Sequence, residues 1–289
     1  MAGETVDFKL YRYDPSMAAA IVFIVLFLIV TALHFYQMMR TRTWIFVPFV
    51  LGGVFEVIGY IGVCITRNLR AISAQETPNW SVAVYSVQTI LLLVAPALFA
   101  ASIYMMLGRI ILVTDGELHS LLPKRWLTKL FVTGDVISFL MQGAGGGIMA
   151  SGTIDALHTG EKIIIGGLVV QLLFFGFFII TGVIFHARLV QQPTPKIYAQ
   201  SIPWERQLYA LYVASLLILV RCIFRLIEYA QGNAGYLISH EVFLYVFDAV
   251  LMFATMAWMA CYHPSEITAL LSRGRGKVVR RVISVYSLH

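Results

Sequence analysis

Three full charges lie within one apolar stretch of the chain, where charge is costly. Arg221, Arg225 and Glu228 are part of RCIFRLIE at 221–228. On a helix, spacings of four and three residues place both guanidinium groups and the carboxylate on one face. Charged side chains inside a membrane point at protein or trapped water and commonly mark binding or transport sites. We therefore expect this face to point into the protein and to bind a polar group.

Four more carboxylates fall in apolar stretches: Glu56, Asp135, Glu241 and Asp248. The last two are seven residues apart, so on a helix they share a face and are expected to meet Arg225 and Arg221 across a helix interface. One interpretation is that these groups form internal ion pairs that fix the register of the helices. However, two arginines cannot neutralise five carboxylates, so some acids are protonated, hydrated or open to a cationic ligand. The amine head group of an amphiphile would suit such a site.

The elements that must position these charges are membrane-spanning helices. Of the 289 residues, 59% are hydrophobic and only 12% are charged, whereas about 25% of residues are charged in soluble proteins. A bilayer is crossed by about 20 apolar residues in a helix. Seven runs of that kind are present, at residues 17–39, 44–66, 82–107, 127–150, 163–187, 207–230 and 239–262. The sequence predicts an all-α polytopic membrane protein with seven transmembrane helices.

The distribution of basic residues predicts the orientation of these helices. With the N-terminus outside, five lysines and arginines lie on the outer side and fourteen on the inner side, as the positive-inside rule requires. The chain then divides into an extracellular stretch at 1–16, a seven-helix domain at 17–262 and a basic cytoplasmic tail at 263–289. Asn79 begins the sequon Asn79-Trp80-Ser81 in an outer loop and is a glycosylation candidate.

Glycine and proline mark two further features of the predicted helices. Gly143 and Gly147 are four residues apart, a spacing that allows a close contact between helices. Pro96 lies within the third apolar run and is expected to kink that helix.

Catalytic and metal-binding signatures are missing from the sequence. It contains no Gly-x-Ser-x-Gly, His-Glu-x-x-His or His-x-x-x-His pattern, so we expect no enzyme and no cofactor. The three cysteines, Cys64, Cys222 and Cys261, lie in apolar runs and fit neither a disulfide framework nor a metal site. Residues 239–262 contain no lysine, which excludes a retinal protein.

Several motifs occur in a fixed order along the chain. They are YDPS at 13–16, EVIGY at 56–60, APA at 95–97, ASIYMMLGR at 101–109, FVTGDVISFLMQG at 131–143, FRLIE at 224–228, EVFLYVFD at 241–248 and HP at 263–264. Together they resemble the fungal RTA-like family, also called the lipid-translocating exporter family, over about residues 11–265. The resemblance implies a seven-span membrane protein linked to tolerance of toxic amphiphiles. Relatives in that family are associated with sphingoid base export, sterol-analogue resistance and porphyrin traffic.

The functional hypothesis is an ATP-independent transporter or exporter of lipid-like amphiphiles, with membrane lipids and an amphiphilic substrate as partners and no nucleic acid. The alternative is a seven-span receptor or sensor that regulates stress responses. We expect the plasma membrane, with the endoplasmic reticulum or vacuolar membrane as alternatives, and the oligomeric state stays open. The candidate substrate-binding residues are Glu56, Asp135, Arg221, Arg225, Glu228, Glu241 and Asp248.

Overall fold

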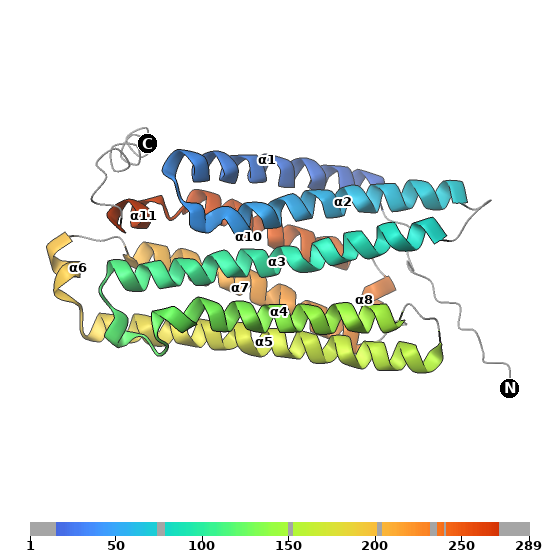
Figure 1. Cartoon of the computed structure of the whole chain (residues 1–289). Helices are drawn as coiled ribbons and strands as arrows, with labels where there is room; N and C mark the ends of the chain where they lie inside the picture. The colour runs from blue at the N-terminus through green and yellow to red at the C-terminus, as the bar shows by residue number, and fades with distance from the viewer. Residues whose placement is uncertain are drawn as a thin grey trace.

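The computed structural model describes residues 16–73, 79–149, 153–200, 204–231, 236–239 and 241–271. All regular elements in these ranges are helices, so the all-α prediction is confirmed (Figure 1). The expected extracellular stretch at 1–16 lies outside the described residues except for Ser16, which caps the first helix by accepting a hydrogen bond from the Ala19 amide. The expected tail is described up to Leu271.

The helices are long, as the apolar runs predict. They are α1 Met17–Thr41, α2 Val47–Ser73, α3 Asn79–Val113, α4 Lys124–Met149, α5 Ile154–Gln191, α6 Pro195–Gln200, α7 Trp204–Ala230, α8 Tyr236–Ser239, α9 Glu241–Leu244, α10 Leu251–Cys261 and α11 Ser265–Leu271. A π-helix, η3 Tyr245–Val250, joins α9 to α10, and two short 3₁₀ helices are η1 Trp44–Phe46 and η2 Glu117–His119.

Five described helices are long and apolar enough to cross a membrane: α1, a span from Trp44 to Ile65, segments of α3 and α5, and the whole of α7. A sixth candidate is the pair Tyr245–Cys261 and Ser265–Leu271, which is bent by 48°. The fourth predicted run, within α4, is not among them, because Asp135, Gln142 and the glycines between 143 and 147 lower its hydropathy. The last predicted run, expected as one helix at 239–262, is instead divided among α8, α9, the π-helix and α10.

The long helices pack side by side around a shared interior. Along the chain, α1 contacts α2, α2 contacts α3, α3 contacts α4 and α4 contacts α5. The ring continues from α5 to α7, from α7 to α10 and from α10 back to α1, and α3 also contacts α7 across the interior. Figure 1 shows the resulting elongated bundle, with α6 and α11 at the end opposite the start of α5. Helix α7 therefore has neighbouring helices on several sides, and its charged side chains can pair with groups on those helices.

Glycines set the closest helix contacts. On α2, a Cβ added at Gly59 would lie 2.6 Å from Leu92 of α3, so the absence of a side chain lets these helices approach. Between α4 and α5 the close contact is made by Gly145, where an added Cβ would lie 2.6 Å from the Gly160 carbonyl oxygen. The contact predicted at Gly143 and Gly147 is wrong in register, since added Cβ atoms there would meet no described atom within 4 Å.

Candidate functional site

The charges of α7 share one face of the helix, as their spacing predicts. Arg225 Nη1 donates to Glu228 Oε2 at 2.9 Å within this helix. Arg221 and Glu228 are buried, and Arg225 is only partly exposed. The face therefore points into the bundle and away from lipid.

Asp248 joins the two arginines. Its Oδ1 accepts a hydrogen bond from Arg221 Nε, and its Oδ2 lies 3.5 Å from Arg225 Nη2. Asp248 is only 2% exposed and belongs to the π-helix, an irregularity that is frequent at functional sites. We refer to Arg221, Arg225, Glu228 and Asp248 as the charged cluster. Its formal charges cancel, and this compensation is what makes the burial of four ions tolerable.

A proline on α3 supplies another acceptor to the cluster. Pro96 has no N–H, so the carbonyl four residues earlier, that of Leu92, loses its helical hydrogen bond. Arg221 Nη2 donates to that oxygen at 2.9 Å. A side chain also caps a free carbonyl at the end of α10, where Gln37 Nε2 donates at 3.0 Å to the carbonyl of Ala260. Pro96 thus supplies the site with an acceptor, in addition to any bend in the helix.

Glu56 of α2 lies beside the charged cluster without joining it. Its carboxylate interacts electrostatically with Asp248, Arg221 and Arg225, yet its Oε1 has no hydrogen-bond partner among the described residues. Tyr60, one turn further along α2, lies near Glu56 and Asp248, and its buried hydroxyl also lacks a described partner. Both residues are almost fully buried, at 2% and 1% exposure. Two unsatisfied polar groups therefore adjoin a compensated set of ions.

The other two predicted residues do not join this network in the described structure. Asp135 of α4 is buried near Tyr104 and Cys222, and its Oδ2 has no described hydrogen-bond partner. Glu241 begins α9, but its side chain lies outside the described part of the structure, so the expected meeting of Glu241 with the arginines stays a prediction. Asn79, the glycosylation candidate, is the first residue of α3, and its side chain is likewise outside the description.

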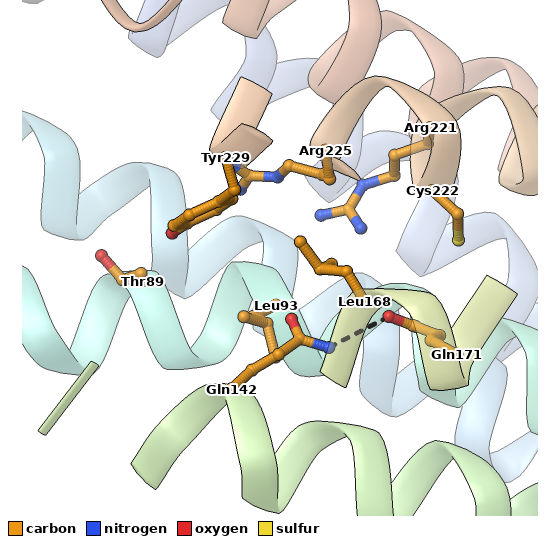
Figure 2. Close-up of a pocket in the computed structure, with 9 residues that line it drawn as sticks. All are labelled: Thr89, Leu93, Gln142, Leu168, Gln171, Arg221, Cys222, Arg225 and Tyr229. Atoms are coloured by element: carbon orange, nitrogen blue, oxygen red, sulfur yellow. Dashed lines mark hydrogen bonds between the residues drawn. The ribbon is translucent and has the colours of Figure 1, made fainter. Parts of the chain in front are cut away.

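A small polar cavity adjoins the arginines. Its volume is about 20 Å³, which is room for about one water molecule. Figure 2 shows Arg221 and Arg225 on one side and the amides of Gln142 and Gln171 on the other. Gln142 Nε2 donates to Gln171 Oε1 at 3.2 Å and to Ser138 Oγ at 2.7 Å. The cavity is built to hold water or one small polar group in this conformation.

Sequence reasoning missed the uncharged polar members of this site. Gln142, Gln171 and Tyr60 carry no formal charge, so charge in an apolar run does not single them out. A signal was available, since glutamine in an apolar helix also requires hydrogen-bond partners. Pro96 predicts that the Leu92 carbonyl lacks a helical hydrogen bond. That Arg221 is its donor could not be predicted, because this depends on how α3 packs against α7.

The arrangement is suited to binding and charge exchange. It offers fixed positive and negative groups, two uncommitted polar groups and a water-sized cavity inside an apolar bundle. Among the described residues, no group of three or more histidine, cysteine, aspartate or glutamate side chains is placed to hold a metal ion.

Comparison with known proteins gives a consistent set of relatives. The family described as RTA1 like protein matches residues 49–270. The chain is 38% identical to protoporphyrin uptake protein 1 of Saccharomyces cerevisiae, with 85% of this chain and 88% of that protein covered. It is 30% identical to the probable lipid transporter atnI of Emericella nidulans, covering 90% and 68%. It is also 26% identical to the sphingoid long-chain base transporter RSB1 of S. cerevisiae, covering 86% and 72%. No solved structure matches the chain.

Proposed function

Because the chain belongs to the RTA1-like protein family, we propose that it is an ATP-independent transporter that moves lipid-like amphiphiles across a membrane and so confers tolerance to them. Relatives named as a lipid transporter and as a sphingoid long-chain base transporter support this class of substrate. Another relative is named for protoporphyrin uptake, so the proposal covers amphiphiles with polar heads of more than one kind. The chain is an integral membrane protein by its apolar helices and its family.

The observation that carries the proposal is the charged cluster within apolar helices. Arg221, Glu228 and Asp248 are buried, and because ions in such a place are costly, they commonly mark functional sites. The adjoining Glu56 carboxylate and the water-sized cavity give a polar head group a place to bind once the bundle opens. We propose that Glu56, Asp135, Arg221, Arg225, Glu228, Glu241 and Asp248 contribute to recognition or movement of that head group.

An apolar hollow offers room for the hydrocarbon part of such a substrate. It has a volume of about 290 Å³ and lies between α2 and α3, where Ile58, Ile61, Ile65, Val87 and Leu91 supply most of its lining. Four of these side chains are exposed on the surface of the bundle: Ile58, Ile61, Ile65 and Val87. An apolar hollow on this surface could take up an acyl chain sideways from the bilayer, because both media are apolar and no polar group has to be buried.

The proposal includes a topology. We infer that α4 is the seventh span, since it packs between α3 and α5 in the ring, and that the N-terminus is outside and the C-terminus cytoplasmic. The plasma membrane is the proposed location, and the endoplasmic reticulum and vacuolar membranes are the alternatives. We propose no catalytic activity and no cofactor.

The proposal is tested by flux in proteoliposomes that contain only the purified protein. A labelled sphingoid base and a labelled phospholipid serve as substrates, without ATP. We expect protein-dependent flux of at least one of them, and we expect Asp248→Asn to abolish it because both arginines lose their bridging carboxylate. Asp155→Asn, which makes the same change at an exposed position on α5, should leave flux unchanged. Thermal unfolding of each variant in detergent shows whether it is folded.

The absence of flux for every amphiphile, with a folded wild-type protein, would overturn the transport proposal. That result would favour the receptor or sensor alternative, in which the same cluster binds an amphiphile without moving it. Binding of the labelled substrates to the purified protein would then still depend on Asp248.

A further inference from the structure

Glu56 and Tyr60 form a pair of buried polar groups that the charged cluster does not satisfy. They are one helical turn apart on α2, so they share a face. Neither Glu56 Oε1 nor the Tyr60 hydroxyl has a hydrogen-bond partner among the described residues. A buried polar group without a partner is destabilising, and two adjacent ones suggest a site whose occupant enters and leaves.

The charges around Glu56 determine whether its carboxyl group can be ionised when no substrate is bound. In the described part of the chain, two arginines and two carboxylates make up the neighbouring cluster, and their charges cancel. An ionised Glu56 would add an uncompensated negative charge in an apolar interior, beside the like charge of Asp248. Such a charge is far more costly than a neutral carboxyl group. The charged cluster therefore has no positive charge left over to balance an ionised Glu56.

Aromatic rings connect this pair to the membrane. Tyr60 stacks on Phe27 with ring centroids 5.6 Å apart and on Phe23 at 5.9 Å, and Phe23 stacks on Tyr245 of the π-helix at 5.4 Å. Phe23 is only partly buried, and its neighbours Val22 and Val25 on α1 are exposed on the bundle surface. Ring faces attract cations, ammonium groups among them. A continuous group of packed rings thus extends from the half-buried Phe23 on α1 to Tyr60, one turn from Glu56.

We propose that Glu56 is a single-cation site that holds either a proton or the ammonium group of the transported amphiphile. When the ammonium group enters, the Glu56 O–H bond breaks, the carboxylate pairs with the ammonium, and the proton leaves to bulk water. The charge at the site is the same before and after the exchange, since one cation replaces another. Tyr60 donates its hydroxyl hydrogen to the carboxylate when the proton has left. This inference rests on the proposed transport function and adds proton exchange to it.

The groups that act on Glu56 from neighbouring elements are few. Asp248 approaches from η3, Arg221 and Arg225 from α7, and Tyr60 from the same helix. From α1 and α3, Thr31 and Leu92 pack against α2 at Gly53 and Gly59, and neither carries a charge. Because the arginines are already paired, the group that changes charge in the exchange is Glu56.

The test is binding of dodecylamine to the full-length wild-type protein in nanodiscs, measured by titration calorimetry between pH 6 and 8. Runs in buffers of different ionisation enthalpy give the number of protons released. We expect close to one proton per amine bound, and affinity that rises by about tenfold per pH unit while Glu56 remains protonated in the free protein. Dodecanol, which has the same chain and no charge, should release no proton.

The variant Glu56→Gln tests whether the released proton comes from Glu56 and not from another group in the helix bundle. A glutamine has no proton to release, so amine binding should weaken and become independent of pH. Glu205→Gln, at an exposed position in the first turn of α7, should behave as the wild type. Three outcomes would each overturn the inference. The wild type could bind the amine without releasing a proton, folded Glu56→Gln could still release one, or the folded wild type could fail to bind dodecylamine. If the protein still moved any amphiphile in the proteoliposome assay, the transport proposal would hold even though this inference had failed.

Discussion

At the scale of single residues, the choice of arginine and aspartate explains how four ions can be buried together. A guanidinium presents five N–H donors in a planar fork, and Arg221 uses this fork to reach Asp248 through Nε and the Leu92 carbonyl through Nη2. Asp248 in turn uses one oxygen for each arginine. A lysine at 221 would keep the charge but could not hold both acceptors in this geometry.

Arg221→Ala should destabilise the folded protein strongly, because it leaves Asp248 with only the longer contact to Arg225. Removal of one partner from a buried pair costs about 3–5 kcal/mol. The measurement is the free energy of unfolding in mixed detergent micelles. Arg221→Lys should fall between Arg221→Ala and the wild type.

The double variant Arg221→Leu with Asp248→Leu should be more stable than Arg221→Ala, since it removes both charges and leaves Arg225 paired with Glu228. Arg188→Ala, at an exposed position near the end of α5, is the control and should change stability by less than about 0.5 kcal/mol. An Arg221→Ala protein as stable as the Arg188→Ala protein would contradict the role given to this ion pair.

At the scale of elements, hydropathy and helical periodicity predicted which segments are helices and which residues share a face, but they did not predict irregularities within a helix or the register between helices. The long helices followed from the lengths of the apolar runs. The shared face of Arg221, Arg225 and Glu228 followed from their spacing. The division of the last predicted helix did not, because a π-helix depends on packing around Asp248 and not on residue propensities. The same limit applies to Gly145, since a row of glycines shows that helices can approach but not which glycine faces the neighbouring helix.

Gly145→Ala should disrupt the contact between α4 and α5, whereas Gly143→Ala should not. The added methyl group at 145 would collide with the Gly160 carbonyl, which is backbone and cannot rotate away. Overpacking of this kind costs about 1–3 kcal/mol. At 143 the methyl group meets open space, and replacing a helical glycine with alanine should stabilise by roughly 0.5–1 kcal/mol.

Thermal unfolding of the two variants in the same detergent measures this difference, and each protein serves as the control for the other. The sign of the change should be opposite at the two positions. Equal effects at both would mean that α4 faces α5 in another register than the one described.

At the scale of the whole molecule, the ring of helices concentrates polar chemistry in its interior and leaves an apolar exterior. Helix α7 and the π-helix supply the charged cluster, α3 adds the Leu92 carbonyl as an acceptor, and α2 places Glu56 beside the cluster. Sequence reasoning anticipated that Glu56, Asp135 and Asp248 lie inside, because a charged residue in an apolar run usually points into the protein. For Glu241 this stays a prediction. It could not anticipate that Glu56 stands beside the cluster unpaired, since that depends on how α2, η3 and α7 meet.

The orientation of this ring can be tested because the two ends of the bundle carry exposed positions. Leu118 lies in η2 and is 94% exposed, and Asp155 is exposed in the first turn of α5, at the opposite end of the bundle (Figure 1). The excess of basic residues on the side of Leu118 predicts that this end is cytoplasmic. In a background that lacks Cys64 and Cys261, a membrane-impermeant maleimide applied to intact cells should label Asp155→Cys and not Leu118→Cys. After permeabilisation both should be labelled, which controls for access. Labelling of Leu118→Cys and not Asp155→Cys in intact cells would mean that the orientation is the reverse of the one proposed.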